Sequence, residues 1–188
     1  MKDEIIEWIK TIILSIVIAL IITTFIKPTI VKNYSMVPTL DENNFLIVNR
    51  FLYNRGTPKR GDIVVFKSPL KTENGKEKLL IKRVIALPGE EIIINNGQVL
   101  IDGVKLEESY LTDDYTIGEV DMVIPDKKFF AMGDNRSNSL DSRDHILGLI
   151  DMDDIIGKAF FRLYPFNRIG FLDNYKDLNR EPATASNQ

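Results

Sequence analysis

The sequence contains no cysteine and only one histidine, His145, in its 188 residues. Without cysteine, the chain cannot form a disulfide, a thiolate zinc site or a cysteine nucleophile. With one histidine it cannot build a multi-histidine metal site, and a hydrolase of the Ser-His-Asp type would depend on His145 alone. The net charge is −3, and acidic and basic residues are interspersed, so there is no electrostatic reason to expect a nucleic-acid partner.

Long apolar runs are also scarce, and the one clear example lies near the N-terminus. Residues 8–26 are apolar apart from Lys10 and four hydroxyl residues, and as a helix they would span roughly 28 Å, about the thickness of a bilayer core. We expect an uncleaved transmembrane anchor over residues 8–27, ended by Pro28 and preceded by a short N-terminal segment, residues 1–7. A cleaved signal peptide is disfavoured because no small-x-small site follows the run, and a buried soluble helix is a third alternative. Charged residues flank both ends, so the positive-inside rule leaves the orientation open.

Downstream of this run the sequence is dominated by short β-type segments. Runs of β-branched and aromatic residues bounded by turn residues predict strands at 45–48, 62–66, 79–87, 91–94, 98–101, 128–132 and 155–164. The Asn-Asn-Gly sequence at residues 95–97 predicts a tight hairpin between two of them. Short strands at this spacing indicate a mostly β domain, a barrel or a sandwich, over residues 28–173. We expect a charged loop at residues 67–78, a surface excursion at residues 104–124 and a polar tail at residues 174–188.

Two residues favour nucleophilic catalysis, although each also has an ordinary structural role. Ser35 follows the apolar run in a segment that Pro38 helps to rigidify, but a serine in a turn is usually a capping residue. Lys82 has apolar neighbours in its predicted strand, which would lower its pKa towards neutrality, but a strand lysine can also extend to solvent at a sheet edge. A neutral amine can accept the proton of a serine hydroxyl. The two-residue period of a strand leaves open whether Lys82 or Arg83 is buried, but only lysine can deprotonate.

A third polar stretch, residues 133–144, is dense in side chains that hydrogen-bond to the backbone. Its ordinary interpretation is a well-satisfied polar loop. The same composition suits a rigid support that holds a catalytic base in one orientation. Asp141 and Arg143 could pair within it, although alternating charge alone is weak support for an ion pair.

Four segments of the chain occur in a characteristic order behind the apolar run. They are residues 35–40 (SMVPTL), 60–66 (RGDIVVF), 82–90 (KRVIALPGE) and 133–143 (GDNRSNSLDSR). Together they resemble the four conserved boxes of bacterial type I signal peptidase, and four ordered boxes are far more specific than any one of them. The resemblance covers roughly residues 5–172. It implies a signal-peptidase-like catalytic domain of β-sheets and barrel-like β-structure attached to one transmembrane helix.

The resemblance also implies roles for individual residues. Ser35 is implied to be the nucleophile and Lys82 the general base, and Ser139 resembles the serine that hydrogen-bonds and orients the lysine amine. The other polar residues of the last box are implied to act as a supporting ion pair, Asp141 with Arg143, and as structural neighbours, Asp134 and Arg136. The implied reaction is the removal of signal peptides from secretory preproteins after an Ala-x-Ala-like site. The enzyme is implied to lie in the cytoplasmic membrane with its catalytic domain outside, and no metal or organic cofactor is expected.

Substrate binding is implied by the same resemblance. Shallow apolar pockets that accept small side chains would be lined by Val31, Met36, Leu40 and Ile81. Residues 79–81 and 30–33 offer strand edges to which an extended signal peptide could add as a further strand.

One position departs from the family pattern. The family usually has Gly or Ser two residues before the nucleophile, whereas this chain has Asn33. The backbone N–H of Ser35 is a natural oxyanion donor. We hypothesise that Asn33 either adopts a positive φ, for which asparagine is a good substitute, or donates its side-chain amide to the oxyanion.

Three rival interpretations remain. A non-catalytic, membrane-anchored assembly factor on the same fold would lack the serine or the lysine, and this chain has both. A self-cleaving repressor-type Ser/Lys protease would carry a DNA-binding segment in place of the apolar run. A histidine-dependent hydrolase would need His145, and the residues around Ser35 do not resemble a nucleophile elbow.

Overall fold

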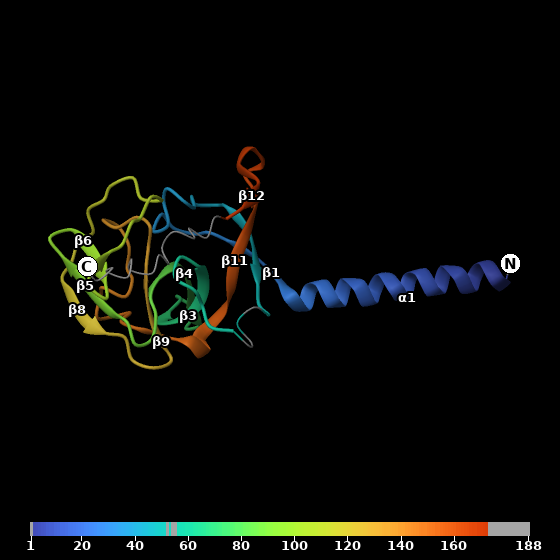
Figure 1. Ribbon diagram of the computed structural model, residues 1–188. Coiled ribbons are helices and arrows are strands. Elements are labelled where there is room, and N and C mark those ends of the chain that lie inside the picture. The colour runs from blue at the N-terminus through green and yellow to red at the C-terminus, as the bar shows by residue number, and fades with distance from the viewer. Residues whose placement is uncertain (1, 52, 54–55, 173–188) are drawn as a thin grey trace, which may run out of the picture.

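The computed structural model describes residues 2–51, 53 and 56–172 (Figure 1). Its N-terminal helix, α1 (Lys2–Phe25), projects away from a β-rich domain. The helix starts earlier than the predicted anchor at residues 8–27, and it ends before Pro28. Because proline disfavours helical dihedral angles at the residue before it, the helix stops upstream, and Pro28 lies within strand β1 (Ile26–Ile30).

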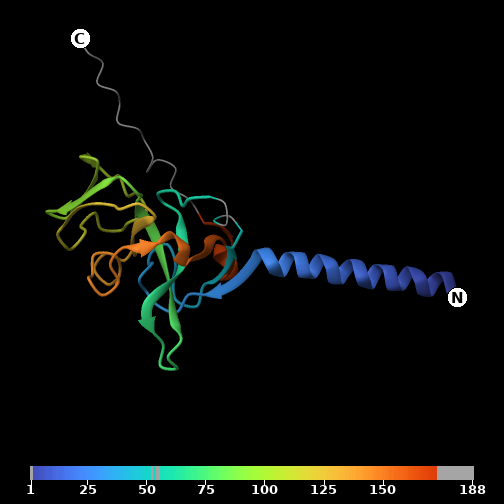
Figure 2. The ribbon, with the colours of Figure 1, turned by 90° about the horizontal axis from the view of Figure 1, so that it is seen from below.

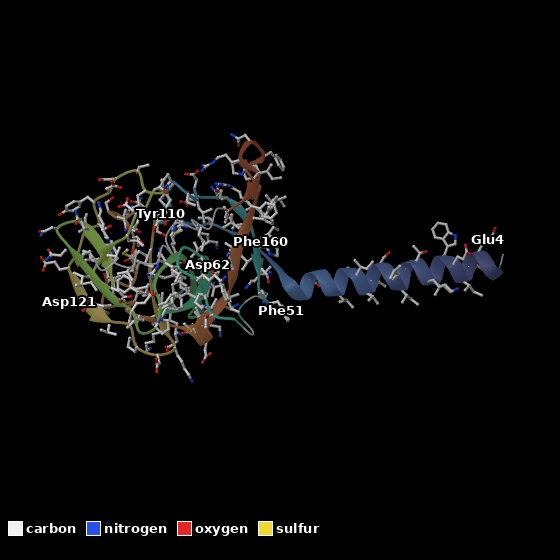
Figure 3. All side chains as sticks on the ribbon, viewed as in Figure 1. Glu4, Phe51, Asp62, Tyr110, Asp121 and Phe160 are labelled. Atoms are coloured by element: carbon white, nitrogen blue, oxygen red, sulfur yellow. The ribbon has the colours of Figure 1, made fainter. Side chains whose placement is uncertain are left out.

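The helix α1 has little contact with the rest of the molecule. Its described apolar side chains, Ile5, Trp8, Ile12 and Leu20 among them, are exposed. Figures 1 and 2 show no other described part of the chain beside the helix, and in Figure 3 its side chains point outwards on several sides. Within the described part of the chain, no helix meets the length and apolarity needed to cross a membrane. The apolar surface of α1 is therefore left uncovered by the described domain.

A large antiparallel sheet forms the body of the domain. Its strands are β1, β2 (Phe45–Asn49), β3 (Ile63–Lys71), β4 (Glu77–Ala86), β9 (Lys128–Met132), β10 (Ile150–Asp151), β11 (Ile155–Tyr164) and β12 (Gly170–Phe171). Their order is β1-β2-β11-β3-β4-β9-β10, and β12 pairs with β11. Two short 3-10 helices, η1 (Met152–Asp154) and η2 (Phe166–Arg168), flank β11. This order brings β4, which carries Lys82, between β3 and β9.

A smaller sheet lies at the end of the domain opposite α1 (Figures 1 and 2). Its strands are β5 (Glu91–Asn95), β6 (Gln98–Ile101), β7 (Val104–Lys105) and β8 (Val120–Val123), in the order β7-β6-β5-β8. The predicted hairpin at residues 95–97 is confirmed, since Asn95 pairs with Gln98 and both Asn96 and Gly97 have positive φ.

Two loop predictions are wrong in extent. Strands β3 and β4 continue through most of residues 67–78, so the connection shortens to residues 72–76, which include the turn at Gly75. Residues 104–124, predicted as a surface excursion, begin and end in strands β7 and β8 and bury several polar side chains between them. These elements could not be predicted because the exposed, charged tip of the β3–β4 hairpin and the segment with buried polar side chains both lack the alternating apolar pattern.

Apolar side chains form three clusters around the sheets. One cluster lies between the small sheet and strands β4 and β9 and includes Ile85, Ile92 and Phe130. The other two involve the large sheet, one with Val65 and Ile81, and the other with Phe66, Leu80 and Phe129 as members. The predicted mostly β fold is confirmed. Strand β4 contributes to all three clusters, which leaves its polar side chains deep inside the protein.

Candidate active site

The predicted nucleophile and base meet inside the domain. Ser35 lies in the loop between β1 and β2, and Lys82 lies in the middle of β4. Lys82 Nζ is 2.5 Å from Ser35 Oγ, to which it donates a hydrogen bond. The exposed fractions are 1% for Lys82 and 7% for Ser35, so the pair is shielded from bulk water but open at the serine. In the neutral form of the amine, the same short contact would let the serine hydroxyl donate its proton to Nζ.

Burial sets the protonation of Lys82. Desolvation lowers the pKa of the Lys82 amine from 10.5 to about 8. The carboxylates of Asp141 and Asp134 oppose this shift, and the cations Arg143 and Lys78 reinforce it. A lysine with a pKa of about 8 is neutral in roughly a tenth of the molecules at pH 7 and in about half of them at pH 8, and the neutral form is the one that a base requires.

Asn33 faces the nucleophile through its side-chain oxygen. Its Oδ1 accepts hydrogen bonds from Ser35 Oγ at 2.9 Å and from the Ser35 backbone N–H at 3.4 Å. Its φ is not positive, so the first form of the Asn33 hypothesis is wrong. The side chain reaches the serine from an ordinary backbone conformation. The asparagine oxygen thus lies where a substrate carbonyl oxygen would meet the Ser35 N–H.

The loop after β9 packs directly against the nucleophile. Asn135 N–H donates to the Ser35 carbonyl at 3.0 Å, and a Cβ on Gly133 would lie 2.3 Å from that carbonyl and 2.3 Å from Ser139 Oγ. Only glycine permits this close approach. The Ser139 hydroxyl is buried beside the Asp141 carboxylate, whose pKa it helps to lower, and a bond from Ser139 to Lys82 is absent from the described contacts. Lys82 donates to Ser35 instead.

The ion pair implied for the last box is present. Arg143 donates from Nε and Nη2 to the two carboxylate oxygens of Asp141, each at 2.8 Å. Asp141 also accepts the Gly133 N–H at 3.0 Å, and Arg143 donates to the carbonyls of Arg136 and Ile117, each at 2.8 Å. Burial raises the pKa of the Asp141 carboxyl, but Arg143, the Gly133 N–H and the Ser139 hydroxyl together lower it below its ordinary value, so the carboxylate is ionised at neutral pH. The pair therefore fixes the loop that carries Ser139.

Arg83, the residue after Lys82, is buried as completely as Lys82. Both cations of this part of β4 are therefore buried, and not only one of them. Arg83 donates to Asp134 at 2.8 and 2.6 Å, and to the Gly61 carbonyl at 2.9 Å. Thr39 Oγ1 donates to the same carboxylate at 2.5 Å. Strand β4, the nucleophile loop and the loop after β9 are thus joined by one buried polar cluster.

A second buried cluster was not predicted from the sequence. Arg136 forms hydrogen bonds to Glu108 at 2.8 and 2.5 Å and to Thr116 Oγ1 at 2.6 Å, and Tyr110 lies against the same group. The described partners of its two terminal nitrogens come from residues 104–124, whereas its Nε donates to the Gly133 carbonyl. This cluster could not be predicted, because polar residues in an aperiodic segment are typical of a solvent-exposed loop.

The implied pocket residues gather beside the nucleophile but are mostly core. Val31, Met36, Leu40 and Ile81 belong to one apolar cluster. Met36 and Leu40 have no exposed surface, whereas Val31 and Ile81 keep 2% and 8%. Of the four, only Val31 and Ile81 present surface to a bound peptide in this structure.

His145 lies apart from this chemistry. Its side chain is 94% exposed, and its ionic partner is Asp144 at 3.5 Å. The hydrogen bonds of the Ser35 hydroxyl in the described chain go to Lys82 and Asn33. The geometry therefore gives no support to a histidine-dependent hydrolase.

Comparison with known proteins agrees with this geometry. The family model described as "Signal peptidase, peptidase S26" matches residues 5–164. A signal peptidase I of Leptolyngbya laminosa is 44% identical over 172 residues, covering 88% of this chain and 83% of the relative. Signal peptidase I S of Bacillus subtilis (strain 168) is 40% identical over 184 residues, covering 89% and 94%.

A crystal structure of a signal peptidase I from Enterococcus faecalis V583 is 29% identical and covers 55% of this chain and 97% of its own, with a TM-score of 0.46. The family assignment depends on the family model and the sequence identities. They show that the chain belongs to the signal peptidase family, peptidase S26, the serine endopeptidases that remove signal peptides.

Proposed function

We propose that this chain removes signal peptides from secretory preproteins with Ser35 as the nucleophile and Lys82 as the general base. The observation that carries the proposal is the 2.5 Å contact between Lys82 Nζ and Ser35 Oγ. Burial lowers the pKa of that lysine to about 8, which makes the neutral amine that a base requires accessible near neutral pH. A hydroxyl nucleophile needs such an adjacent base.

The reaction follows from this geometry in two halves. Ser35 Oγ attacks the scissile carbonyl carbon while Lys82 Nζ takes the hydroxyl proton. The Lys82 ammonium then gives that proton to the leaving amine, which departs as the N-terminus of the mature protein and leaves the signal peptide as an ester on Ser35. A water molecule, deprotonated by Lys82, attacks the ester and restores the serine hydroxyl.

The negative oxygen of each tetrahedral intermediate needs hydrogen-bond donors. The Ser35 N–H is one, and it now faces Asn33 Oδ1, which the substrate carbonyl would displace. Rotation of the Asn33 side chain would then present its Nδ2 amide to the same oxygen. Asn33→Ala should reduce kcat by about 10²-fold, the usual effect of losing one oxyanion donor. Asn33→Asp, which lacks the amide, should be at least as impaired. Unchanged turnover in Asn33→Ala would show that the Asn33 side chain is not an oxyanion donor.

Ser139 is proposed to orient the amine of Lys82 during turnover. Its buried hydroxyl lies beside Gly133, next to the Ser35 backbone and close to the Asp141 carboxylate. When Lys82 releases Ser35 Oγ to the substrate, its amine needs another group to hold it, and the Ser139 hydroxyl is suited to this. Asp141 and Arg143 would keep the Ser139 loop in place.

The substrate is proposed to be an extended peptide ending in an Ala-x-Ala-like site. Strand β9 pairs with β4 only from Arg83 onwards, so no described strand covers the second edge of residues 79–81. The backbone of Val31 is hydrogen-bonded to the backbone of Asn43 and Asn44 on one side. A peptide on the other side could pair with the backbone of Lys32 and Asn33. A peptide between these edges would meet Val31 and Ile81, where little space favours small side chains.

The helix α1 is proposed to hold the enzyme in the cytoplasmic membrane with the catalytic domain outside. Its uncovered apolar side chains would be costly in water and favourable in lipid. Alkaline carbonate extraction of membranes should leave the full chain in the pellet, and protease added to intact spheroplasts should degrade the domain. Release by carbonate would show a peripheral attachment, and protection from protease would reverse the proposed orientation.

The proposed function is tested by cleavage of a preprotein with an Ala-x-Ala site by the full chain in detergent or lipid. The unmodified chain and His145→Ala should cut after the second alanine, as read by N-terminal sequencing of the product. Ser35→Ala and Lys82→Ala should be inactive but folded. An inactive unmodified chain on both a peptide and a lipid-embedded preprotein would favour the assembly factor.

A further inference from the structure

Tyr110 lies between two arginines that belong to the catalytic segments. Its ring centroid is 3.9 Å from Arg83 Cζ, a cation–π distance. Its hydroxyl donates to Glu108 Oε1 and accepts a hydrogen bond from Arg136 Nη2 at 3.2 Å. The tyrosine is 4% exposed, and Figure 3 labels it within the body of the domain. One side chain thus contacts the arginine next to the base and the arginine of the supporting loop.

Both arginines act on backbone close to the reacting groups. Arg83 follows Lys82 directly in β4, so its position fixes the direction of the lysine side chain. Arg136 Nε donates to the Gly133 carbonyl at 3.1 Å, and Gly133 packs against the Ser35 carbonyl and the Ser139 hydroxyl.

Charge balance in this cluster depends on Glu108. Arg136 is 5% exposed, and its guanidinium forms a bidentate pair with Glu108. Burial, together with the Glu108 carboxylate, raises the pKa of the Tyr110 hydroxyl well above its ordinary value, so the tyrosine stays neutral between the charges. A buried cation without this carboxylate would draw in water or shift its loop.

We propose that Tyr110 and Glu108 are positioning residues for the peptidase reaction, which through Arg83 and Arg136 hold the Lys82 strand in register with the loop at Gly133. They touch neither the substrate nor the reacting atoms. Their role rests on the proposed function, since it has meaning only if Lys82 is the base. Residues 106–117 are therefore part of the catalytic support and not only a connection between strands.

The test compares Tyr110→Leu, Tyr110→Phe and Glu108→Gln with a matched control, Tyr115→Leu. Tyr115 lies in the same segment but is exposed, and its ring packs on the turn at Gly97. Each full-length variant is assayed in detergent with an Ala-x-Ala peptide for kcat, KM and the pH dependence of kcat/KM. Rates are expressed per folded molecule, with the folded fraction taken from a thermal unfolding curve.

Tyr110→Leu and Glu108→Gln should lower kcat by about 10- to 100-fold with little change in KM, because misplacement of about 1 Å can cost 10²-fold. In Tyr110→Leu, water entering beside Arg83 should also move the acidic limb of kcat/KM to higher pH. Tyr110→Phe keeps the ring against Arg83 and the Arg136–Glu108 ion pair and loses only the two hydrogen bonds of the hydroxyl, so its kcat should stay within about fivefold of that of the unmodified chain. Tyr115→Leu should match the unmodified chain.

A purely structural role would give a different result. Tyr110→Leu would then have a lower melting temperature but an unchanged kcat and acidic limb per folded molecule, and the proposal would be overturned. If Tyr110→Leu does not fold, Glu108→Gln decides alone: unchanged kcat overturns the proposal, and a selective loss of kcat supports it. Failure of the proposed function is recognised by a different variant. If Lys82→Ala were active, Lys82 would not be the base, whatever the Tyr110 and Glu108 variants show.

Discussion

Arg83 and Asp134 form a bidentate ion pair whose two side chains have no exposed surface. The preceding residue in the strand, Lys82, is buried to the same degree but makes its described hydrogen bond to a serine. The two cations differ in how readily they lose a proton. The arginine guanidinium does not deprotonate in proteins, whereas burial of the lysine, only partly offset by nearby carboxylates, lowers its pKa to about 8.

Breaking this pair should strongly destabilise the fold. Asp134→Asn leaves the buried Arg83 guanidinium without its anion, which should cost about 3–5 kcal/mol in the free energy of unfolding. Urea unfolding of the variant and of the unmodified chain measures the difference. Asp121→Asn, at an exposed position of β8, makes the same chemical change and should be nearly neutral. Equal stability of the two variants would show that the buried pair contributes nothing.

Replacing the catalytic lysine with an apolar residue should stabilise the protein at neutral pH. The Lys82 pKa is about 8 in the folded chain and 10.5 when unfolded, so the unfolded state binds more protons between these values. The stability of the unmodified chain therefore rises as pH increases from about 8 to 10.5. Lys82→Met escapes this penalty and should gain about 3 kcal/mol at pH 7, at 1.36 kcal/mol per pKa unit, and much less at pH 10.

The control for this prediction is Lys71→Met, at an exposed position of the neighbouring strand β3. It should leave the pH dependence of stability unchanged. A constant difference between Lys82→Met and the unmodified chain from pH 7 to pH 10 would contradict the lowered lysine pKa.

Gly133→Ala should impair catalysis more than folding. The added Cβ would lie 2.3 Å from both the Ser35 carbonyl and the Ser139 hydroxyl, so the nucleophile loop must move. We expect kcat to fall on the order of 10²-fold, since small displacements of reacting groups have effects of this size. Gly75→Ala, in an open turn at positive φ, should lose some stability but keep kcat. Full activity of Gly133→Ala would mean that the loop does not constrain the serine.

Much of the fold could be predicted because apolar alternation and turn residues mark the strands that face a core. The hairpin at residues 95–97 and strands β9 and β11 follow these signals closely. Strand β1 was not predicted because Lys27 and Pro28 interrupt its apolar residues, and proline is unusual within a strand. The charged tip of the β3–β4 hairpin was predicted to be a loop because neither of its faces is buried, so its sequence has no alternating apolar pattern.

The site was predictable in its residues but not in its contacts. Asp141 and Arg143 are close in sequence, and their pairing was expected. The hydrogen bonds that Ser35 donates to Asn33 Oδ1 depend on a side-chain rotation that sequence does not encode. The contact of Tyr110 with Arg83 joins segments 27 positions apart through a buried polar cluster, for which hydrophobic periodicity gives no signal.

The pH dependence of kcat/KM tests the central claim, that Lys82 is the base of Ser35, most directly. Because only the neutral amine can accept the serine proton, activity should rise with pH through a limb near 8, the pKa to which burial lowers this lysine. The limb should be unchanged in His145→Ala. A limb near 6.5 that disappears in His145→Ala would assign the base to histidine and contradict the account.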